Sequence, residues 1–286
     1  MIDLHSHSNA SDGTLSPRNL VEYASKKGVS VLALTDHDTT AGLVEAKKAA
    51  KKHKITFVSG VELNIAWPTG EFHLLGLGLV NTSPQLQEII QQLQQDRKNR
   101  NSRIIEKMQS DGINISEQAL AEMFPGATLG RPHIASFLVA KKICKTRQQA
   151  FDKYIGKHKP YYSERIGADL DKAIAAIVAS GGIPVLAHPL SLYISYGKIE
   201  ATLANLRDRG VLGLEAFHSG VRKTDALRLE EIARKLDFFV TGGSDFHGEG
   251  IRADRKIGYA CGGEKIPERL WTEELEPMLK QNKYSG

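Results

Sequence analysis

The sequence predicts a parallel α/β barrel, and three observations support this prediction. Strand and helix signals alternate along residues 1–80 and again along residues 170–259. The apolar segments that read as strands are IDLH, VLALTD, TFVSGVEL, FHLLGLGLV, PVLAH, GLEAFH and FFVTGGSD. Histidines and carboxylates lie at the ends of most of these segments, as active-site side chains do at one rim of a barrel.

Composition indicates a soluble globular protein with room for one such barrel. The chain has 286 residues, of which 41% are hydrophobic and 25% charged, and no apolar stretch is long enough to cross a bilayer. Cys144 and Cys261 have no metal-type spacing, and the opening MIDLHSH already carries candidate ligands, so we expect a cytoplasmic protein without a signal peptide. The net charge of +5 fits solvated lysines, as in AKKAAKKHK, and also fits a polyanionic substrate.

Each barrel helix has a local signal. Ser16-Pro17 is a good cap and first residue for the first helix, and the second is expected over 41–52. Helices over 170–180, 199–208 and 224–236 alternate with the later strands, and a short helix over 266–283 ends the chain.

Residues 82–165 contain no convincing strand. Ser83-Pro84 begins a long helical pattern that runs to Ser110 and stops at Gly112. Shorter helices are expected over 116–124, 132–143 and 146–155. We therefore predict a barrel domain formed by residues 1–81 and 166–286, and an all-helical insertion domain over its C-terminal mouth, formed by residues 82–165.

Nine residues are candidate metal ligands. On a strand, His5 and His7 point to the same side, and Asp245-Phe-His247 repeats this geometry. Any one of these side chains alone is as easily a solvent-facing or buried structural residue, but nine at matching strand ends indicate a multinuclear site. Nitrogen and oxygen ligands without thiolate fit Mn, Zn or Fe. The candidates are His5, His7, Asp12, His37, Glu62, His73, His188, Asp245 and His247.

The insertion carries candidate phosphate-binding residues. Arg97, Arg100 and Arg103 share a helix face, which fits either a functional or a solvated basic surface. Arg131 and His133 flank Pro132 at an expected helix N-terminus, a favourable place for a phosphate, although His133 also suits a capping or packing role. The stretch YIGKHKPYY fits either an ordinary surface loop or a charged surface on which bases stack. It contains Tyr154, Lys157, Lys159, Tyr161 and Tyr162.

The segments DLHSHS-x-x-SDG, LALTDHD, GVE, AHP and GSDFH resemble those of a polymerase-and-histidinol-phosphatase (PHP) domain. The resemblance implies a distorted seven-stranded PHP barrel that holds three divalent metal ions, with manganese expected first and zinc or iron as alternatives. It also implies phosphoester hydrolysis, and it places the family's ligands on the nine candidates above. No ligand is missing, which argues against a non-catalytic PHP module.

The insertion, with its GRPHIA segment, is similar to the TrpH-like group, also called RNase AM. This implies a 5′→3′ exoribonuclease for short 5′-phosphorylated RNA, or a phosphatase for the 3′-phosphate of nucleotides such as pAp. The resemblance assigns the 5′-phosphate to Arg100, Arg103, Arg131 and His133. His218 ends the sixth strand, where it can contact the scissile phosphate or the leaving oxygen, and His37 and Asp245 are expected to join it in catalysis.

A small-metabolite phosphatase of the histidinol-phosphatase type is the main alternative, and a metal-dependent amidohydrolase also begins with His-x-His on a barrel strand. The sequence gives no sign of a membrane partner or of an obligate protein partner.

Overall fold

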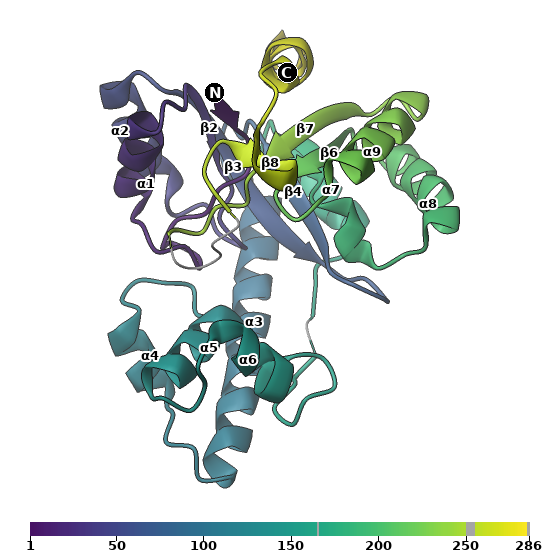
Figure 1. Ribbon diagram of the computed structural model, residues 1–286. Helices are drawn as coiled ribbons and strands as arrows, with labels where there is room; N and C mark the ends of the chain where they lie inside the picture. Colours follow the sequence, from purple (N-terminus) through teal and green to yellow (C-terminus); the bar gives the residue numbers. More distant parts are fainter. Residues whose placement is uncertain (165, 250–254, 285–286) are drawn as a thin grey trace.

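The computed structural model describes residues 1–164, 166–249 and 255–284. Residue 165, the last of the predicted insertion, lies outside this part, as do residues 285 and 286 at the end of the chain. One sheet curls into a nearly closed barrel with helices on its outside (Figure 1). Its strands, in spatial order, are β1 (Ile2–Asp3), β2 (Val31–Leu34), β3 (Thr56–Ile65), β4 (Phe72–Leu77), β5 (Ile183–Leu186), β6 (Gly213–His218) and β7 (Phe239–Gly243).

Strand β4 departs from the predicted all-parallel arrangement. It pairs antiparallel with both β3 and β5, whereas the other neighbours in the sheet are parallel. Only residues 66–71 connect β3 to β4, and a parallel crossover needs about a dozen residues or more. The prediction is therefore wrong at β4, and the short connection is the reason. As a result His73, at the start of β4, lies at the rim that the parallel strands reach with their C-terminal ends.

The barrel closes where the chain following β1 meets the chain following β7. The Leu4 N–H donates to the Gly242 carbonyl at 3.3 Å, and the Asp245 N–H donates to the His5 carbonyl at 2.9 Å. Ser6 and Phe246 form a parallel bridge. These bonds bring the first and last candidate ligands of the chain side by side.

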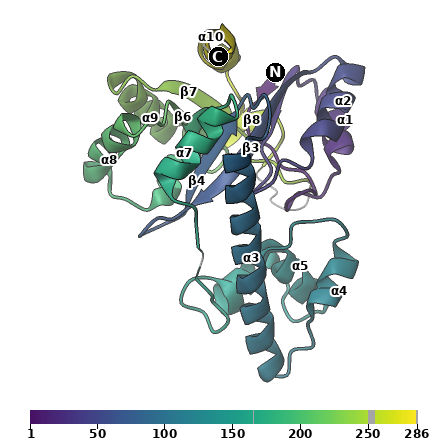
Figure 2. The same cartoon turned by 180° about the vertical axis from the view of Figure 1, so that it is seen from behind.

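The outer helices lie where the sequence predicts them. Helices α1 and α2 cover one side of the barrel, and α8 and α9 cover the opposite side (Figure 1). Helix α10 lies at the end of the barrel away from the helical segment, which consists of the second half of α3 and α4–α6 (Figures 1 and 2). Ser16 and Ser83 accept hydrogen bonds from Asn19 and Leu86, as expected of N-caps. Among the described residues, no helix combines the length and apolarity needed to cross a membrane. The helices are α1 (Pro17–Lys26), α2 (Leu43–His53), α3 (Pro84–Ser110), α4 (Glu117–Met123), α5 (Arg131–Ala140), α6 (Arg147–Ala150), α7 (Leu170–Ala179), α8 (Tyr196–Asp208), α9 (Lys223–Lys235) and α10 (Glu276–Tyr284).

Helix α3 joins the barrel to the helical segment. Leu86, Ile90 and Leu93 in its first half pack into the core of the barrel, beside α7. Ile104 and Met108 in its second half pack into a separate core with α4 and α5. Figure 2 shows α3 running from the sheet into this helical group. Because β4 is antiparallel, its C-terminal end lies away from the mouth, and α3 carries the chain back along the barrel. The change from one core to the other falls within α3.

Candidate metal centre

The nine candidate ligands gather at one rim of the barrel. His5 and His7 follow β1, and His37 lies three residues beyond the end of β2. His73 begins β4, whereas Glu62 lies within β3. The side chains of His5, His7 and Glu62 are fully buried, and the other six are buried or half-buried.

Glu62 lies at the centre of the cluster. Its Oε1 is 2.8 Å from His73 Nδ1 and 3.0 Å from His188 Nε2. Its Oε2 is 2.9 Å from His37 Nδ1, 3.3 Å from His7 Nε2 and 3.4 Å from His5 Nε2. One carboxylate thus faces five imidazoles, with two of them on one oxygen and three on the other. This is the arrangement that a carboxylate bridging two cations requires.

The remaining carboxylates extend the cluster on either side of Glu62. Asp245 Oδ1 lies 3.1 Å from His7 Nε2, and Asp12 Oδ1 lies 3.1 Å from His247 Nε2. Ligand atoms within 4.8 Å of one another form three overlapping groups. These groups are His7, Asp12, His37 and His247; His5, His7 and Asp245; and His37, Glu62 and His73.

The donor set fits divalent cations. Among the residues that the structure describes, two buried atoms at the centre of the cluster, Glu62 Oε2 and His37 Nδ1, make no well-directed hydrogen bond, although they lie 2.9 Å apart. Buried polar atoms in proteins are almost always hydrogen-bonded, so these atoms are better explained as facing a cation. Nitrogen and oxygen donors without thiolate suit Mn, Fe or Zn.

Electrostatics keep the central carboxylate charged. Burial by itself raises the pKa of Glu62, but the neighbouring imidazoles of His37, His73 and His5 hold that pKa well below its ordinary value. Burial lowers the pKa of His247 and favours its neutral form. An ionised carboxylate and a neutral imidazole are the forms that bind metal.

Glu215 is a buried residue of β6 that the sequence analysis missed. Its Oε1 is 2.9 Å from His5 Nδ1, and its Oε2 accepts the N–H of His188 at 2.8 Å. His188 has φ 28°, a left-handed conformation that is unusual for a residue other than glycine. Glu215 therefore orients one imidazole and fixes the strained backbone of another. The only sequence signal is a charged residue in the middle of the apolar segment GLEAFH.

The acidic residues beside His37 support loops. Asp36 accepts hydrogen bonds from the backbone and hydroxyl of Ser8 and from the hydroxyl of Ser11. Asp38 accepts the N–H of Asn64 at 3.0 Å and forms a buried ion pair with Arg97. Asp36 thereby holds the loop that carries Asp12, and Asp38 ties α3 to the loop that carries His37.

His218 lies beside the cluster at the end of β6. Its Nε2 is 3.3 Å from Asp245 Oδ2, and its Nδ1 accepts the N–H of Gly220 at 3.0 Å. With Nδ1 acting as an acceptor, the ring proton of a neutral His218 is on Nε2, which faces the metal cluster. Burial favours this neutral form because it lowers the pKa of His218 well below its ordinary value.

A cavity of about 540 Å³ opens over the cluster between the barrel rim and the helical segment. The barrel contributes Asp12, His37, His73, His188, His218, Asp245 and His247, together with Arg255, to its lining. The helical segment contributes Arg131, Pro132, Arg147, Gln148 and Phe151.

Of the four predicted phosphate contacts, only Arg131 lines this cavity. The Arg131 guanidinium is 3.2 Å from Glu71 and lies over the ring of Phe151. His133 is buried, accepts the Gly130 N–H through Nδ1 and packs edge-on against Phe124. Burial lowers the pKa of His133 to about 4, so its imidazole is neutral.

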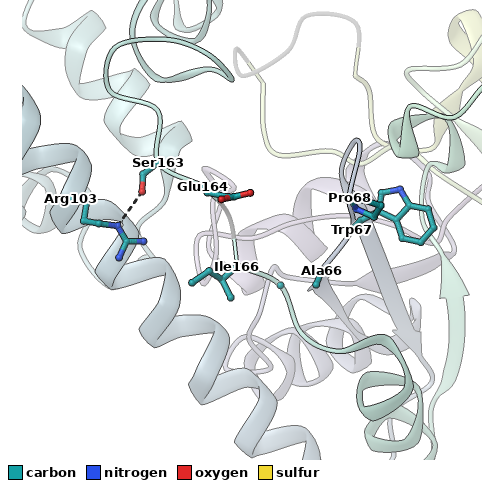
Figure 3. Close-up of a pocket in the computed structure, with 8 residues that line it drawn as sticks. Ala66, Trp67, Pro68, Arg103, Ser163, Glu164 and Ile166 are labelled. Carbon is teal, nitrogen blue, oxygen red and sulfur yellow. Dashed lines mark hydrogen bonds between the residues drawn. The ribbon is translucent and has the colours of Figure 1, made fainter.

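Arg100 and Arg103 point elsewhere. Arg100 donates to Asn101, while Arg103 donates to Ser163 and borders a second, more open pocket of about 680 Å³ (Figure 3). That cavity is lined by Ala66, Trp67, Pro68, Arg103, Ser163, Glu164, Ile166 and Gly167, and it contains none of the nine candidate ligands.

Arg147 and Arg255, in contrast, line the cavity over the cluster. Arg255 also donates to the carbonyl and carboxylate of Asp245. The sequence analysis singled out neither arginine, because nothing local distinguishes them from other basic residues.

Two of the three tyrosines of YIGKHKPYY are used inside the helical core. Tyr154 and Tyr161 stack on each other at 6.1 Å and pack in this core, and the hydroxyl of Tyr161 donates to Asp111. Tyr162 is half-buried.

A nearly closed α/β barrel with a His, Asp and Glu cluster at its rim defines a metal-binding barrel. The chain belongs to the PHP domain family, whose model matches residues 3–166. A 5′–3′ exoribonuclease of Haemophilus influenzae is 36% identical, over 86% of this chain and 89% of its own length. A 3′,5′-nucleoside bisphosphate phosphatase of Chromobacterium violaceum is 31% identical over 97% of both chains. The 5′–3′ exoribonuclease Rnm of Escherichia coli is 32% identical, over 95% of this chain and 94% of its own.

Solved structures show the same fold. A structure described as an amidohydrolase of Chromobacterium violaceum, with bound sulfate, superposes with a TM-score of 0.87 at 29% identity, covering 98% of this chain and 96% of its own. A Bifidobacterium adolescentis protein assigned as a metal-dependent phosphoesterase has a TM-score of 0.84 at 30% identity, covering 96% and 94%.

Proposed function

We propose that this protein is a metal-dependent phosphoesterase that removes nucleotides from the 5′ end of short 5′-phosphorylated RNA. It also hydrolyses the 3′-phosphate of 3′,5′-bisphosphonucleotides such as pAp. The observation that carries the proposal is the cluster around Glu62, which opens into a cavity that arginines line on the opposite side. The relatives named as exoribonucleases and as a bisphosphate phosphatase support it.

The nine clustered side chains are proposed to hold three divalent ions, manganese first and zinc or iron as alternatives. When bound, such ions activate water and neutralise charge on the phosphoryl oxygens. Glu62 would supply one carboxylate oxygen to each of two ions, and His37 and Asp245 would contribute to catalysis by holding ions beside the reacting phosphate. The free and buried state of Cys144 and Cys261 fits a protein of the cytoplasm.

The other residues of the cavity orient the substrate. His218 donates a hydrogen bond from Nε2 to the scissile phosphate or the leaving 3′-oxygen, because its Nδ1 is already engaged by Gly220. Arg131 and Arg147 hold the 5′-phosphate of the terminal nucleotide at a fixed distance from the cluster. A phosphate fixed in this way measures one nucleotide from the end. The same geometry accepts the diester of RNA and the monoester of pAp.

The test is a product analysis with manganese-loaded protein. The substrates are pAp and a short RNA that carries either a 5′-phosphate or a 5′-hydroxyl. We expect stepwise release of mononucleotides from the 5′-phosphorylated RNA and phosphate release from pAp. Equal rates on the 5′-phosphate and 5′-hydroxyl RNA contradict the phosphate pocket, and release of phosphate from pAp with intact RNA reduces the function to a nucleotide phosphatase.

Arg131→Ala tests the pocket directly. Loss of a charge-assisted hydrogen bond of about 1.5–3 kcal/mol lowers kcat/KM on 5′-phosphorylated RNA by roughly 10- to 150-fold, and much less on the 5′-hydroxyl RNA. Arg209→Ala is the control, because Arg209 pairs with Asp171 on the outer surface. An equal loss on both RNAs argues against a role for Arg131 in selecting the 5′-phosphate.

A further inference from the structure

One of the two lysine-rich stretches of this chain lies beside the catalytic cavity. Residues 141–159, the basic segment, contain six lysines and Arg147 against a single acidic residue, Asp152. The net charge of this segment is therefore +6, whereas the whole chain carries +5. Residues 46–54 carry +5, but they lie on and just after α2, at the end of the barrel away from the cavity, so the basic segment is the lysine-rich stretch that adds positive charge beside the cavity mouth.

The lysines of the basic segment are exposed. Within the part of the chain that the structure describes, none of the six forms an ion pair with a carboxylate, and Asp152 accepts from Gln148 instead. Elsewhere in the described part of the chain some lysines are paired, as in Lys26–Glu22, Lys223–Glu264, Lys235–Glu200 and Lys280–Glu276, whereas the lysines of α2 form no such pair either. Unpaired like charges repel one another, and this cost is relieved by a polyanion.

The basic segment is continuous with the site. Arg147, Gln148 and Phe151 form part of the cavity wall, and lysines lie on both sides of them in the chain. Lys157 also donates to the Thr69 carbonyl at 3.3 Å, so the end of the segment contacts the loop between β3 and β4. An RNA strand whose 5′ end enters the cavity can therefore leave it along the basic segment.

We propose that the basic segment binds the phosphates of the RNA strand beyond its first nucleotide. The proposal rests on the proposed function, since it takes the catalytic cavity as the place of the 5′ end. Exposed lysines bind a phosphate backbone without reading bases, and Tyr154 and Tyr161 are already packed against each other. The segment thus favours RNA of several nucleotides over a mononucleotide, with little preference for sequence.

A matched pair of variants tests this inference. The first variant combines Lys141→Gln, Lys145→Gln, Lys153→Gln and Lys159→Gln. It leaves Lys142, whose φ is 61°, and Lys157, which holds the β3–β4 loop. The control removes the same charge from α2 through Lys47→Gln, Lys48→Gln, Lys51→Gln and Lys52→Gln. These lysines are exposed on α2, and Lys47 borders a cavity beside Thr56 at the start of β3, which is the end of the barrel away from the metal cluster.

The readout is the ratio of kcat/KM for a 5′-phosphorylated RNA decamer to that for a 5′-phosphorylated dinucleotide, with manganese-loaded protein. In the first variant we expect this ratio to fall at least about tenfold at 0.1 M salt. A plot of log affinity against log salt concentration should become less steep by about 2–3, because each of the four replaced lysines contributes roughly 0.7 to the slope when it contacts a phosphate. In the control both quantities stay near the wild-type values. An unchanged ratio in the first variant, or equal losses in the two variants, overturns the inference.

A second measurement requires no turnover. Fluorescence anisotropy with the same decamer, in the presence of a chelator, reports RNA binding by the wild type and both variants. Weaker binding by the first variant alone supports the basic segment even if wild-type protein hydrolyses no RNA, in which case the proposed function is what fails. Equal binding by all three proteins rejects the basic segment while leaving the phosphoesterase assignment intact. Melting temperatures check that each variant is folded.

Discussion

Single residues of the cluster depend on neighbours that bind no metal themselves. Glu215 holds His5 through Nδ1 and also accepts the backbone N–H of His188. A carboxylate behind a metal-binding histidine fixes the tautomer and direction of the ring and makes it a better donor. Because Glu215 contacts two candidate ligands from different strands, it is a positioning residue for both sides of the cluster.

Glu215→Gln should weaken metal binding about 10- to 100-fold, since the neutral amide removes the charge behind His5. Competition between the protein and a fluorescent chelator for Mn or Zn measures this directly. Glu230→Gln is the control, as Glu230 is a partly buried carboxylate paired with Arg269 on the outside of the barrel. Metal affinity equal to that of the wild type would show that Glu215 only supports packing.

At the level of elements, α3 couples the helical segment to the metal centre. The ion pair between Arg97 and Asp38 is buried at both ends, where the exposed fractions are 8% and 2%. Asp38 directly follows His37, so the middle of α3 is tied to the loop that carries a central candidate ligand. A buried ion pair adds little net stability, yet breaking it leaves an uncompensated charge and is strongly destabilising.

Arg97→Met is expected to lower the free energy of unfolding by about 3–5 kcal/mol, measured by urea denaturation. The double variant Arg97→Met, Asp38→Asn should lose less than the sum of the two single variants, because neither charge is then left unpaired. Arg103→Met on the same helix is the matched control. Arg103 is exposed, and its replacement should change stability by no more than about 0.5 kcal/mol. Additive losses would contradict direct coupling through this ion pair.

In the whole molecule, the candidate ligands come from both ends of the chain and close the barrel. His5 and Asp245 lie where the segments following β1 and β7 meet, and Glu62 joins them from β3. Cations held by these side chains would therefore link strands that are far apart in sequence. A ligand that binds only the folded state stabilises it by mass action.

Metal loading should raise the melting temperature. One site at a hundred times its Kd contributes about 2.7 kcal/mol, which corresponds to a shift of roughly 5–10 °C for a domain of this size. Differential scanning calorimetry of chelator-treated protein, with and without added Mn, measures this shift. An equal concentration of potassium chloride should give no comparable increase. If the melting temperature does not depend on Mn, the ions contribute nothing to closing the barrel.

The sequence by itself determined the strand and helix order, the long helix from Pro84 to Ser110 and the identity of the clustered histidines and carboxylates. These features follow from local signals: apolar periodicity, capping residues and the two-residue repeat that places His5 and His7 on one side. Tertiary structure decided the antiparallel direction of β4, the partners of Asp36 and the places of Arg100 and Arg103. It also revealed Glu215, Arg147 and Arg255. An acid or base on a strand or helix looks the same in sequence whether it faces solvent, a second layer or the cavity, because the elements that pack against it come from distant parts of the chain.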